Sequence, residues 1–563
     1  MKLAMHPETD AAGAGRGVGR GALGLIPASV LWLVVLATIA RLLYLALLCP
    51  FPLVEDEAQY WVWSTRPDWS YYSKGPGIAW SIWLSVRLTE WWAGLSEFGV
   101  RWFAPLYGAV TALAAAGLAV DLSRDRRAGF YAASVVMLLP MTQVLGSFVM
   151  TIDSPFVACW ALGLWAGWRC LDPDGTRARW RWGVLGVALA LGFVFKYTMV
   201  LLLPLLLIAA IAMPRRARIG FAGPSLALGI ALLGLLPVAL WNAQHEWVAL
   251  RHLMGHLKLP GGDVSLARPE ATGLREPYSV LWTLEYLGVQ AALFGPSVVL
   301  VWIGARHLAA AAATRAAGRF GVVSTLFLLV LYGVVSFWTP VEANWALAAT
   351  VGGSVLAGVA AGPGMAVWHR RVAIWKARVP ASRRREGLLV RRPESVTQVA
   401  WHASVGYGVL LIGLVLAVPI LASVDALRTR FATHRILGVE TYIARLHQLA
   451  REHKERTGAE PLLISYHYGI AAQMTFYLPN HPMVRVAGSR LGVRRTQWDL
   501  WPDLDLADPS LVGRDALLVG GSDRQWSAWF DRVQDLGVLP EDPRRSRWTY
   551  VGERFRGPVG ARP

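Results

Sequence analysis

The first residues that could do chemistry lie directly after a long apolar run. The stretch FPLVEDEAQYWVWS, residues 51–64, contains Glu55, Asp56 and Glu57, and YYSKGPG follows it with Lys74. A carboxylate within hydrogen-bond reach can take the proton of an attacking hydroxyl, and a fixed cation can hold a leaving phosphate as its charge grows. We therefore predict that Asp56 is a general base and that Lys74 binds a phosphate.

Further ionisable groups lie in segments that interrupt the apolar runs. Asp153 in TIDSP is a second candidate for the base, and Lys196 and Arg101 are further candidates for the phosphate ligand. Each has an ordinary alternative, because an aspartate before Pro155 can cap a helix and a lysine near a span end can extend its amine to the interface. Acidic residues at a helix start are likewise favoured by the helix dipole. Convergence of carboxylates and cations on one side of a membrane favours the chemical interpretation.

The chain that must position these residues is strongly apolar. It has 563 residues, of which 55% are hydrophobic and 16% charged, and apolar runs of spanning length recur from Ile26 to Ala422. The three cysteines show neither a zinc-site spacing nor an obvious disulfide framework. We predict a polytopic α-helical membrane protein with about eleven spans, near residues 27–49, 101–120, 128–145, 155–169, 183–196, 198–213, 219–240, 284–304, 320–338, 344–361 and 401–423.

Arginines gather in short loops between these runs, so the formal charge of +18 is explained by membrane orientation and not by nucleic-acid binding. The N-terminus, with Arg16 and Arg20, and the basic loops near residues 124–127, 177–181, 215–218, 306–319 and 370–392 are predicted to face the cytoplasm. The acidic stretch, TIDSP, FKYT, WNAQHEWVALRHLMGHLKLPGGD, TPVEANW and everything after about Ser423 then face outward.

The sequence after Ser423 is no longer membrane-like. VETYIARLHQLAREHKERTG is typical of an amphipathic helix with a glycine stop, and LLISYHYG and DALLVGGSD each indicate a strand and a turn. We predict three parts: a flexible cytoplasmic N-terminus (1–25), a transmembrane domain (26–424) and a small periplasmic, extracytoplasmic α/β domain (425–563).

Glycosyl transfer from a polyprenyl-phosphate sugar would use such a site. The lipid tail would lie in the bilayer and the phosphate at the interface, beside Lys74 and near Lys196 or Arg101. Asp56 would take the proton of the acceptor hydroxyl. Attack opposite the phosphate would invert the anomeric centre, as in the single displacement of an inverting glycosidase.

These segments resemble a family. DEAQYWVWS followed by YYSKGPGIAW is similar to the first outer loop of C-type glycosyltransferases related to the bacterial lipid A aminoarabinose transferase and, more distantly, to protein O-mannosyltransferases. In this chain the turn is GPG where relatives often have Pro-Pro. The similarity continues in the same order through EFGVRWFAPLYGAVTAL, MTIDSPFVACWAL, LGFVFKYTMVLLLP, WNAQHEWVALRH, FGPSVVL, VEANWAL, AAQMTFYLPNHP and RRTQWDLW.

The resemblance implies a helical membrane domain with a smaller extracytoplasmic domain over a cavity, and it implies roles for residues at matching positions. Asp56 would be the base with Glu57 beside it, and Asp153 would line the sugar or acceptor pocket. The remaining assignments are to the donor phosphate (Lys74, Lys196, Tyr197 and Arg101) and to the substrate cavity or its wall (Tyr71, Tyr72, Asn344, Trp345 and His245).

Three histidines suggest a second kind of chemistry. If WNAQHEWVALRHLMGH is one helix, His245, His252 and His256 form a single stripe, with Glu246 near its edge. Imidazole and carboxylate suit zinc, but an amphipathic helix whose polar face contains histidines is the stronger explanation. We therefore expect no metal site and no cofactor, although a divalent metal stays open.

A flippase or transporter of a lipid-linked sugar is the alternative function. A cavity lined by cations could hold a lipid phosphate without chemistry, but the chain has no clear internal repeat, and Arg41 is its main mid-span charge. We favour a transferase in the bacterial inner membrane that takes a sugar from an undecaprenyl-type phosphate to a lipid, glycan or protein hydroxyl. The sequence identifies neither the sugar nor the acceptor.

Overall fold

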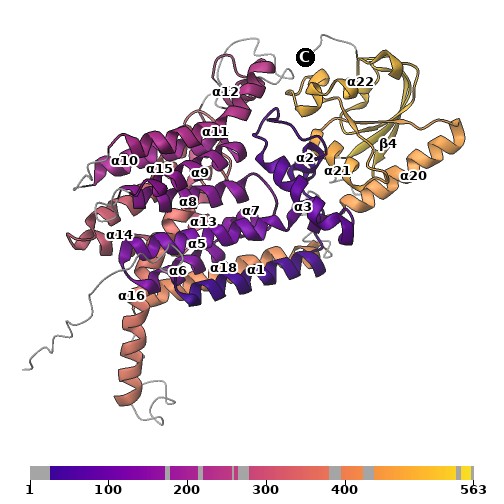
Figure 1. The fold of residues 1–563 in the computed structure, drawn as a ribbon. Coiled ribbons are helices and arrows are strands. Elements are labelled where there is room, and N and C mark those ends of the chain that lie inside the picture. Colours follow the sequence, from indigo (N-terminus) through magenta and orange to yellow (C-terminus); the bar gives the residue numbers. More distant parts are fainter. Residues whose placement is uncertain are drawn as a thin grey trace, which may run out of the picture.

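A computed structural model describes residues 26–171, 178–213, 220–256, 259–263, 278–378, 395–422, 437–539 and 547–558. Most of the chain forms a helical bundle, and a smaller sheet-containing unit lies at one end of it (Figure 1). The bundle helices are α1 (Ala28–Leu47), α5 (Phe103–Ser123), α6 (Arg126–Leu138), α7 (Pro140–Ser147), α8 (Asp153–Leu171), α9 (Arg179–Phe195), α10 (Leu202–Ala212), α11 (Ala222–Gln244), α13 (Val280–Phe294), α14 (Ser297–Ala310), α15 (Arg315–Val335), α16 (Ala349–Arg378) and α18 (Val396–Ala422).

The bundle contains several helices suited to a bilayer. Among the described residues six helices are long and apolar enough to cross a membrane, or up to eight if each of two bent pairs counts as one span. Large apolar side chains on these helices, such as Trp32, Leu47 and Leu233, are exposed on the surface, as expected of helices that contact lipid. This is a multi-pass membrane protein, as the apolar runs predicted.

Two predicted spans are not straight helices. The run near 128–145 is broken between α6 and α7, which meet at 77°. Pro140 begins α7, and Leu139 before it is extended, because the proline ring disfavours a helical residue in front of it. The run near 284–304 bends by 80° between α13 and α14, where Gly295 has a φ of +50°.

The predicted basic loop near residues 370–392 begins instead as helix. α16 continues to Arg378 and carries Arg370 and Arg371, and its last part extends away from the bundle (Figure 1). Residues 379–394, with the other arginines of that segment, lie outside the described residues, as do Arg16, Arg20, Arg177 and the segment 214–219.

Short helices interrupt the chain after α1. The first loop (residues 48–102) contains α2 (Glu55–Ser64), α3 (Gly77–Ala93) and α4 (Glu97–Arg101). Three carboxylates fill the first turn of α2, where the helix dipole favours negative charge. The Glu57 side chain also accepts the Val54 N–H at 3.1 Å, which closes the start of the helix.

The C-terminal unit (residues 437–539 and 547–558) has a five-stranded sheet of order β2-β1-β3-β5-β4. Strands β2, β1 and β3 are parallel, and β3, β5 and β4 are antiparallel. The predicted helix and both predicted strands are present, with the helix stop at Gly458 in the left-handed region. The elements are α20 (Val439–Thr457), β1 (Leu462–Ser465), α21 (Tyr468–Tyr477), β2 (Arg485–Val486), β3 (Ala516–Val519), α22 (Asp523–Trp526), β4 (Phe530–Val538) and β5 (Trp548–Phe555), with short 3-10 turns between β2 and β3.

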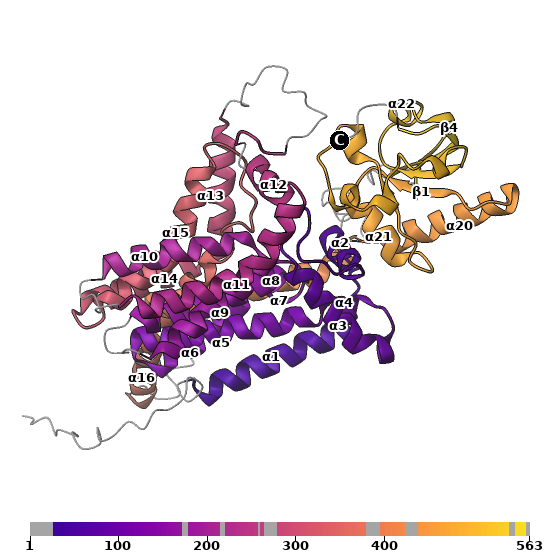
Figure 2. The ribbon, with the colours of Figure 1, turned by 45° about the horizontal axis from the view of Figure 1, so that its top comes forward.

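The first loop and the C-terminal unit share one hydrophobic core, which lies between the bundle and the sheet (Figure 2). Trp61 of α2 packs edge-on against Phe476 of α21 at 4.9 Å between ring centroids. Polar contacts add to this core, since Leu53 donates its N–H to the Tyr477 hydroxyl and accepts from the Gln473 amide. The C-terminal unit is therefore packed directly against the start of α2.

Candidate active site

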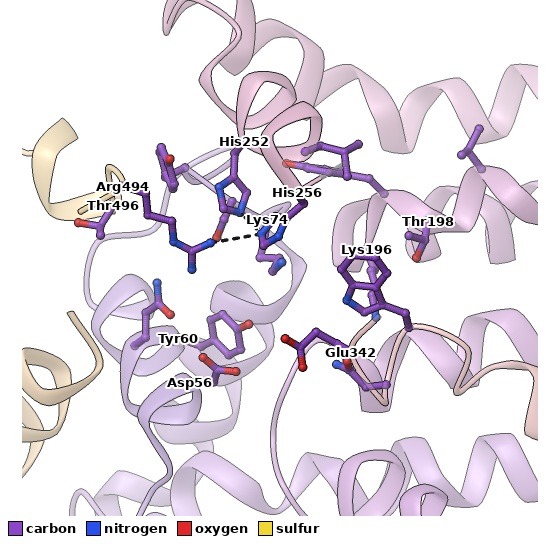
Figure 3. Close-up of a pocket in the computed structure, with 18 of the residues that line it drawn as sticks. Asp56, Tyr60, Lys74, Lys196, Thr198, His252, His256, Glu342, Arg494 and Thr496 are labelled. Atoms are coloured by element: carbon purple, nitrogen blue, oxygen red, sulfur yellow. Dashed lines mark hydrogen bonds between the residues drawn. The ribbon is translucent and has the colours of Figure 1, made fainter. Parts of the chain in front are cut away.

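A cavity of about 820 Å³ lies where the first loop, the bundle and the C-terminal unit meet. Helix α12 (Val248–His256), which follows α11 of the bundle, forms a further wall of this cavity. Figure 3 shows charged side chains from all of these elements pointing into one space. The polar lining residues are Asp56, Gln59, Tyr60, Tyr72, Ser73, Lys74, Lys196, Tyr197, Thr198, His252, His256, Tyr332, Glu342, Asn344, Tyr468, Arg494, Arg495 and Thr496.

Asp56 lines this cavity from the first turn of α2. Within the described residues its carboxylate makes no hydrogen bond or ion pair. Its side chain is exposed to the open cavity, but the protein around it removes much of its water, and this desolvation raises the pKa of Asp56; Glu55 and Asp153 nearby raise it further, while Lys74 lowers it. A carboxylate without a partner, facing a cavity, is suited to accept a proton.

Glu57 and Arg101 lie elsewhere, although both were predicted at the site. Both are fully buried, and the Glu57 carboxylate accepts from Arg101 Nε at 2.8 Å and from Arg101 Nη2 at 2.5 Å. Glu57 also accepts the Met150 N–H, and Arg101 donates to the carbonyls of Phe51 and Pro52. The pair joins α2 to the end of α4 within the first loop and does not line the cavity, so we withdraw its assignment to catalysis and phosphate binding.

Lys74 lines the same cavity as Asp56 (Figure 3). Among the described residues its amine has neither an ion-pair nor a hydrogen-bond partner. Burial lowers the pKa of Lys74 to about 8, with further lowering by Lys196 and Arg494. Its backbone is fixed, since the Lys74 carbonyl accepts from the Tyr71 N–H and the Ser70 hydroxyl. Such a lysine is prepared to receive an anion.

Lys196, Asp153 and Asn344 form a second polar group. The Asp153 carboxylate accepts from Lys196 Nζ at 2.7 Å and from Asn344 Nδ2 at 2.8 Å. Lys196 and Asn344 line the cavity, but Asp153 lies behind them and is buried. With both oxygens engaged, Asp153 holds the lysine in place and is a poorer candidate for the base than Asp56.

Of the tyrosines predicted at the site, two line the cavity and one does not. Tyr72 and Tyr197 line the cavity, and the Tyr72 hydroxyl is buried without a hydrogen-bond partner in the described part of the chain. Tyr71 does not line it, because its ring stacks on Trp63 and its hydroxyl donates to the carbonyls of Trp63 and Arg66.

The histidine stripe is broken. α11 ends at Gln244, and Glu246 and Trp247 have positive φ values of 54° and 58°, so the predicted continuous helix does not form. His245 stacks on Trp241 outside the cavity lining, which contradicts its predicted cavity role. His252 and His256 stay together on α12, with their Nε2 atoms 3.1 Å apart. No group of three metal-binding side chains occurs among the described residues.

The sequence indicated the C-terminal unit over the cavity but did not identify the residues that this unit contributes to the lining. Arg494 reaches into the cavity from that unit and lies 3.3 Å from His256 Nε2 (Figure 3). Tyr468 and Arg495 also line the cavity, as does Glu342 from the segment before α16. The available signal was the two adjacent arginines, Arg494 and Arg495, that begin RRTQWDLW in a segment predicted to face outward.

The chain resembles known glycosyltransferases in sequence. Residues 73–241 match the family model described as dolichyl-phosphate-mannose-protein mannosyltransferase. The chain is 27% identical over 302 residues to the lipid A galacturonosyltransferase RgtD of Rhizobium johnstonii, covering 54% of this chain and 59% of that protein. It is 28% identical over 184 residues to an undecaprenyl phosphate-alpha-4-amino-4-deoxy-L-arabinose arabinosyl transferase of Pectobacterium atrosepticum, covering 32% of each. The aligned regions thus span less than two thirds of these relatives.

The fold extends the comparison to nearly the whole chain. The crystal structure of ArnT from Cupriavidus metallidurans in the apo state matches with a TM-score of 0.58 at 15% identity, covering 93% of this chain and 98% of ArnT. The form bound to undecaprenyl phosphate matches with a TM-score of 0.57 at 16% identity, covering 92% and 97%. The protein has the ArnT-like fold of C-type glycosyltransferases. The resemblance expected from the first-loop motif is confirmed.

Proposed function

We propose that the protein is an inverting glycosyltransferase that uses a polyprenyl-phosphate sugar. The observation that carries this proposal is that Asp56 and Lys74 line one cavity and that, among the described residues, neither side chain has a hydrogen-bond or ion-pair partner. Asp56 is exposed to the open cavity and Lys74 is half-buried, and the surrounding protein disfavours the charge of both. Reactants that engage both charges would explain their retention.

The roles follow from charge. Lys74, with Lys196 beside it, holds the phosphate and stabilises the negative charge that grows as the sugar–phosphate bond breaks. Asp56 takes the proton from the acceptor hydroxyl while that oxygen attacks the anomeric carbon. Attack from the side opposite the phosphate inverts the anomeric centre in a single displacement.

Similarity to the arabinosyl transferase supports an undecaprenyl-phosphate sugar as donor, and similarity to the lipid A galacturonosyltransferase supports lipid A, or another lipid, as acceptor. We propose that the cavity and the C-terminal unit face the periplasm and that the N-terminus faces the cytoplasm, since the described basic residues Arg126 and Arg127 and the basic end of α16 lie at the end of the bundle away from the C-terminal unit (Figure 1). We keep the three predicted parts as proposed domains: 1–25, 26–424 and 425–563.

The test is transfer by the full chain in nanodiscs, with labelled polyprenyl-phosphate sugars as donors and lipid A or a membrane extract as acceptor. The wild type should move label into a new product, and Asp56→Asn should not, while both retain saturable donor binding. Donor binding without transfer for every donor and acceptor would refute the transferase and favour a carrier of lipid-linked sugars.

A further inference from the structure

The cavity contains more cations than one phosphate requires, since four basic side chains of the described residues line it beside the carboxylates of Asp56 and Glu342: Lys74, Lys196, Arg494 and Arg495. Lys74 and Arg494 are close enough that Arg494 lowers the pKa of Lys74, so each disfavours the positive charge of the other. Among the described residues, neither makes an ion pair with a carboxylate. Lys196 differs from both, because it is paired with Asp153.

Within the described part of the chain, the groups in contact with Arg494 carry no negative charge, although Asp56 and Asp263 are near enough for Arg494 to lower the pKa of each carboxyl. Arg494 Nη1 lies 3.3 Å from His256 Nε2, which must accept because a guanidinium only donates. His256 is therefore the neutral tautomer with its proton on Nδ1, and burial and Arg494 lower its pKa to about 4. Burial likewise lowers the pKa of His252, whose Nε2 lies 3.1 Å from that of His256. Tyr468 makes the other contact to Arg494, through its hydroxyl.

Position separates Arg494 from the donor-phosphate ligands. Lys74 comes from the first loop and Lys196 from the segment after α9, whereas Arg494 comes from the C-terminal unit and enters beside α12 (Figure 3). The polyprenyl phosphodiester carries one negative charge, which Lys74 and Lys196 can bind. An arginine fork with remaining N–H groups is suited to a second oxyanion, either a carboxylate or a phosphate, bound in two-point fashion.

We propose that Arg494, with Tyr468 and the His252–His256 pair beside it, forms a second oxyanion-binding subsite in the cavity. This proposal rests on the proposed transferase function and narrows its substrates. The subsite takes a negatively charged group of a substrate other than the donor phosphate. That group is either a carboxylate on the sugar, as in a uronic acid, or a phosphate on the acceptor lipid.

Two pairs of substrates distinguish these sources. One pair is a polyprenyl-phosphate uronic acid and the matching neutral hexose, which differ only in the carboxylate. The other is a lipid acceptor with and without its phosphates. For each pair, the ratio of kcat/KM for the charged to the uncharged substrate is measured in nanodiscs for wild type and Arg494→Gln. Arg532→Gln, an exposed position on β4, removes the same charge away from the cavity.

One of the two ratios should fall about 10- to 100-fold in Arg494→Gln, as expected for loss of a charge-assisted hydrogen bond, and Arg532→Gln should leave both unchanged. The pair that responds identifies the source of the anion. Unchanged ratios in both pairs would overturn the subsite. Loss of polyprenyl-phosphate binding as severe as in Lys74→Ala would also overturn it, because Arg494 would then belong to the donor-phosphate site. A wild type that transfers nothing contradicts the proposed function, and with it the subsite.

Discussion

Replacing Glu57 by alanine should damage the fold, whereas replacing its neighbour Asp56 should damage only the chemistry. The Glu57 carboxylate accepts four hydrogen bonds: two from Arg101, one from the Met150 N–H and one from the Val54 N–H. Glu57→Ala leaves the Arg101 guanidinium buried with no carboxylate, since its other described partners are the carbonyls of Phe51 and Pro52 and the Cys49 sulfur. Removing one member of a buried ion pair costs about 3–5 kcal/mol.

The buried Met150 N–H adds to this loss, because a buried donor without an acceptor costs about 1–3 kcal/mol, and the half-buried Val54 N–H adds less. The contributions overlap, so we expect about 3–5 kcal/mol or somewhat more of lost stability in Glu57→Ala. The double variant Glu57→Leu with Arg101→Met should recover much of the loss, because no charge then remains buried without a partner.

The measurement is thermal unfolding of the full chain in detergent or nanodiscs, beside donor binding and transfer. Glu57→Ala should unfold at a clearly lower temperature than Asp56→Asn, which should unfold like the wild type. A Glu57→Ala variant with wild-type stability and no transfer would refute the structural role and return Glu57 to the catalytic group. A double variant no more stable than Glu57→Ala would refute the stranded-charge argument.

Three further predictions concern the cavity. Asp56→Asn should lower kcat by about 10²- to 10⁴-fold with little change in donor affinity, since an amide cannot take the proton; wild-type turnover would exclude Asp56 as base. Because the pKa of Lys74 is about 8, its positive charge is present below that pH and lost above it. The affinity for polyprenyl phosphate should therefore be constant below about pH 7 and fall up to tenfold per pH unit above about pH 8. Lys74→Ala should abolish this pH dependence, and a flat wild-type profile up to about pH 9.5 would refute the prediction. Gln497 accepts a hydrogen bond from the Tyr72 N–H at 2.6 Å and so fixes the backbone near Lys74. Gln497→Leu should raise the donor KM about tenfold and change kcat less, whereas Gln497→Glu keeps the acceptor oxygen and should retain activity. Equal loss of activity in both variants would contradict this positioning role.

Much of the fold could be predicted from sequence because its signals are local. Long apolar runs predicted the bundle, and the pattern from Val439 to Gly458 predicted α20 and its stop. The bends after Leu139 and near Gly295 depend on packing as well as on proline and glycine, so two spans predicted as continuous are broken. Local strain at Glu246 and Trp247 likewise separated histidines that periodicity alone had placed on one stripe.

The candidate site was predictable only in part. The spacing of acid and lysine in the first loop indicated Asp56 and Lys74, and both line the cavity. Sequence could not separate Asp56 from Glu57, because adjacent helical positions point in different directions and the position of the core decides which one is buried. Arg494 was missed because its approach depends on how the C-terminal unit packs on the first loop.

Contacts between the C-terminal unit and the first loop have a consequence for chimeric enzymes. Gln473 and Tyr477 hold Leu53, just before Asp56, and Gln497 holds Tyr72, just before Lys74. Exchanging the C-terminal unit with that of a relative would therefore change the supports of both groups at once. A chimera that transplants residues 51–74 together with 467–498 should keep the two halves matched, whereas exchange of either half alone should leave an intact bundle with a displaced base and phosphate ligand.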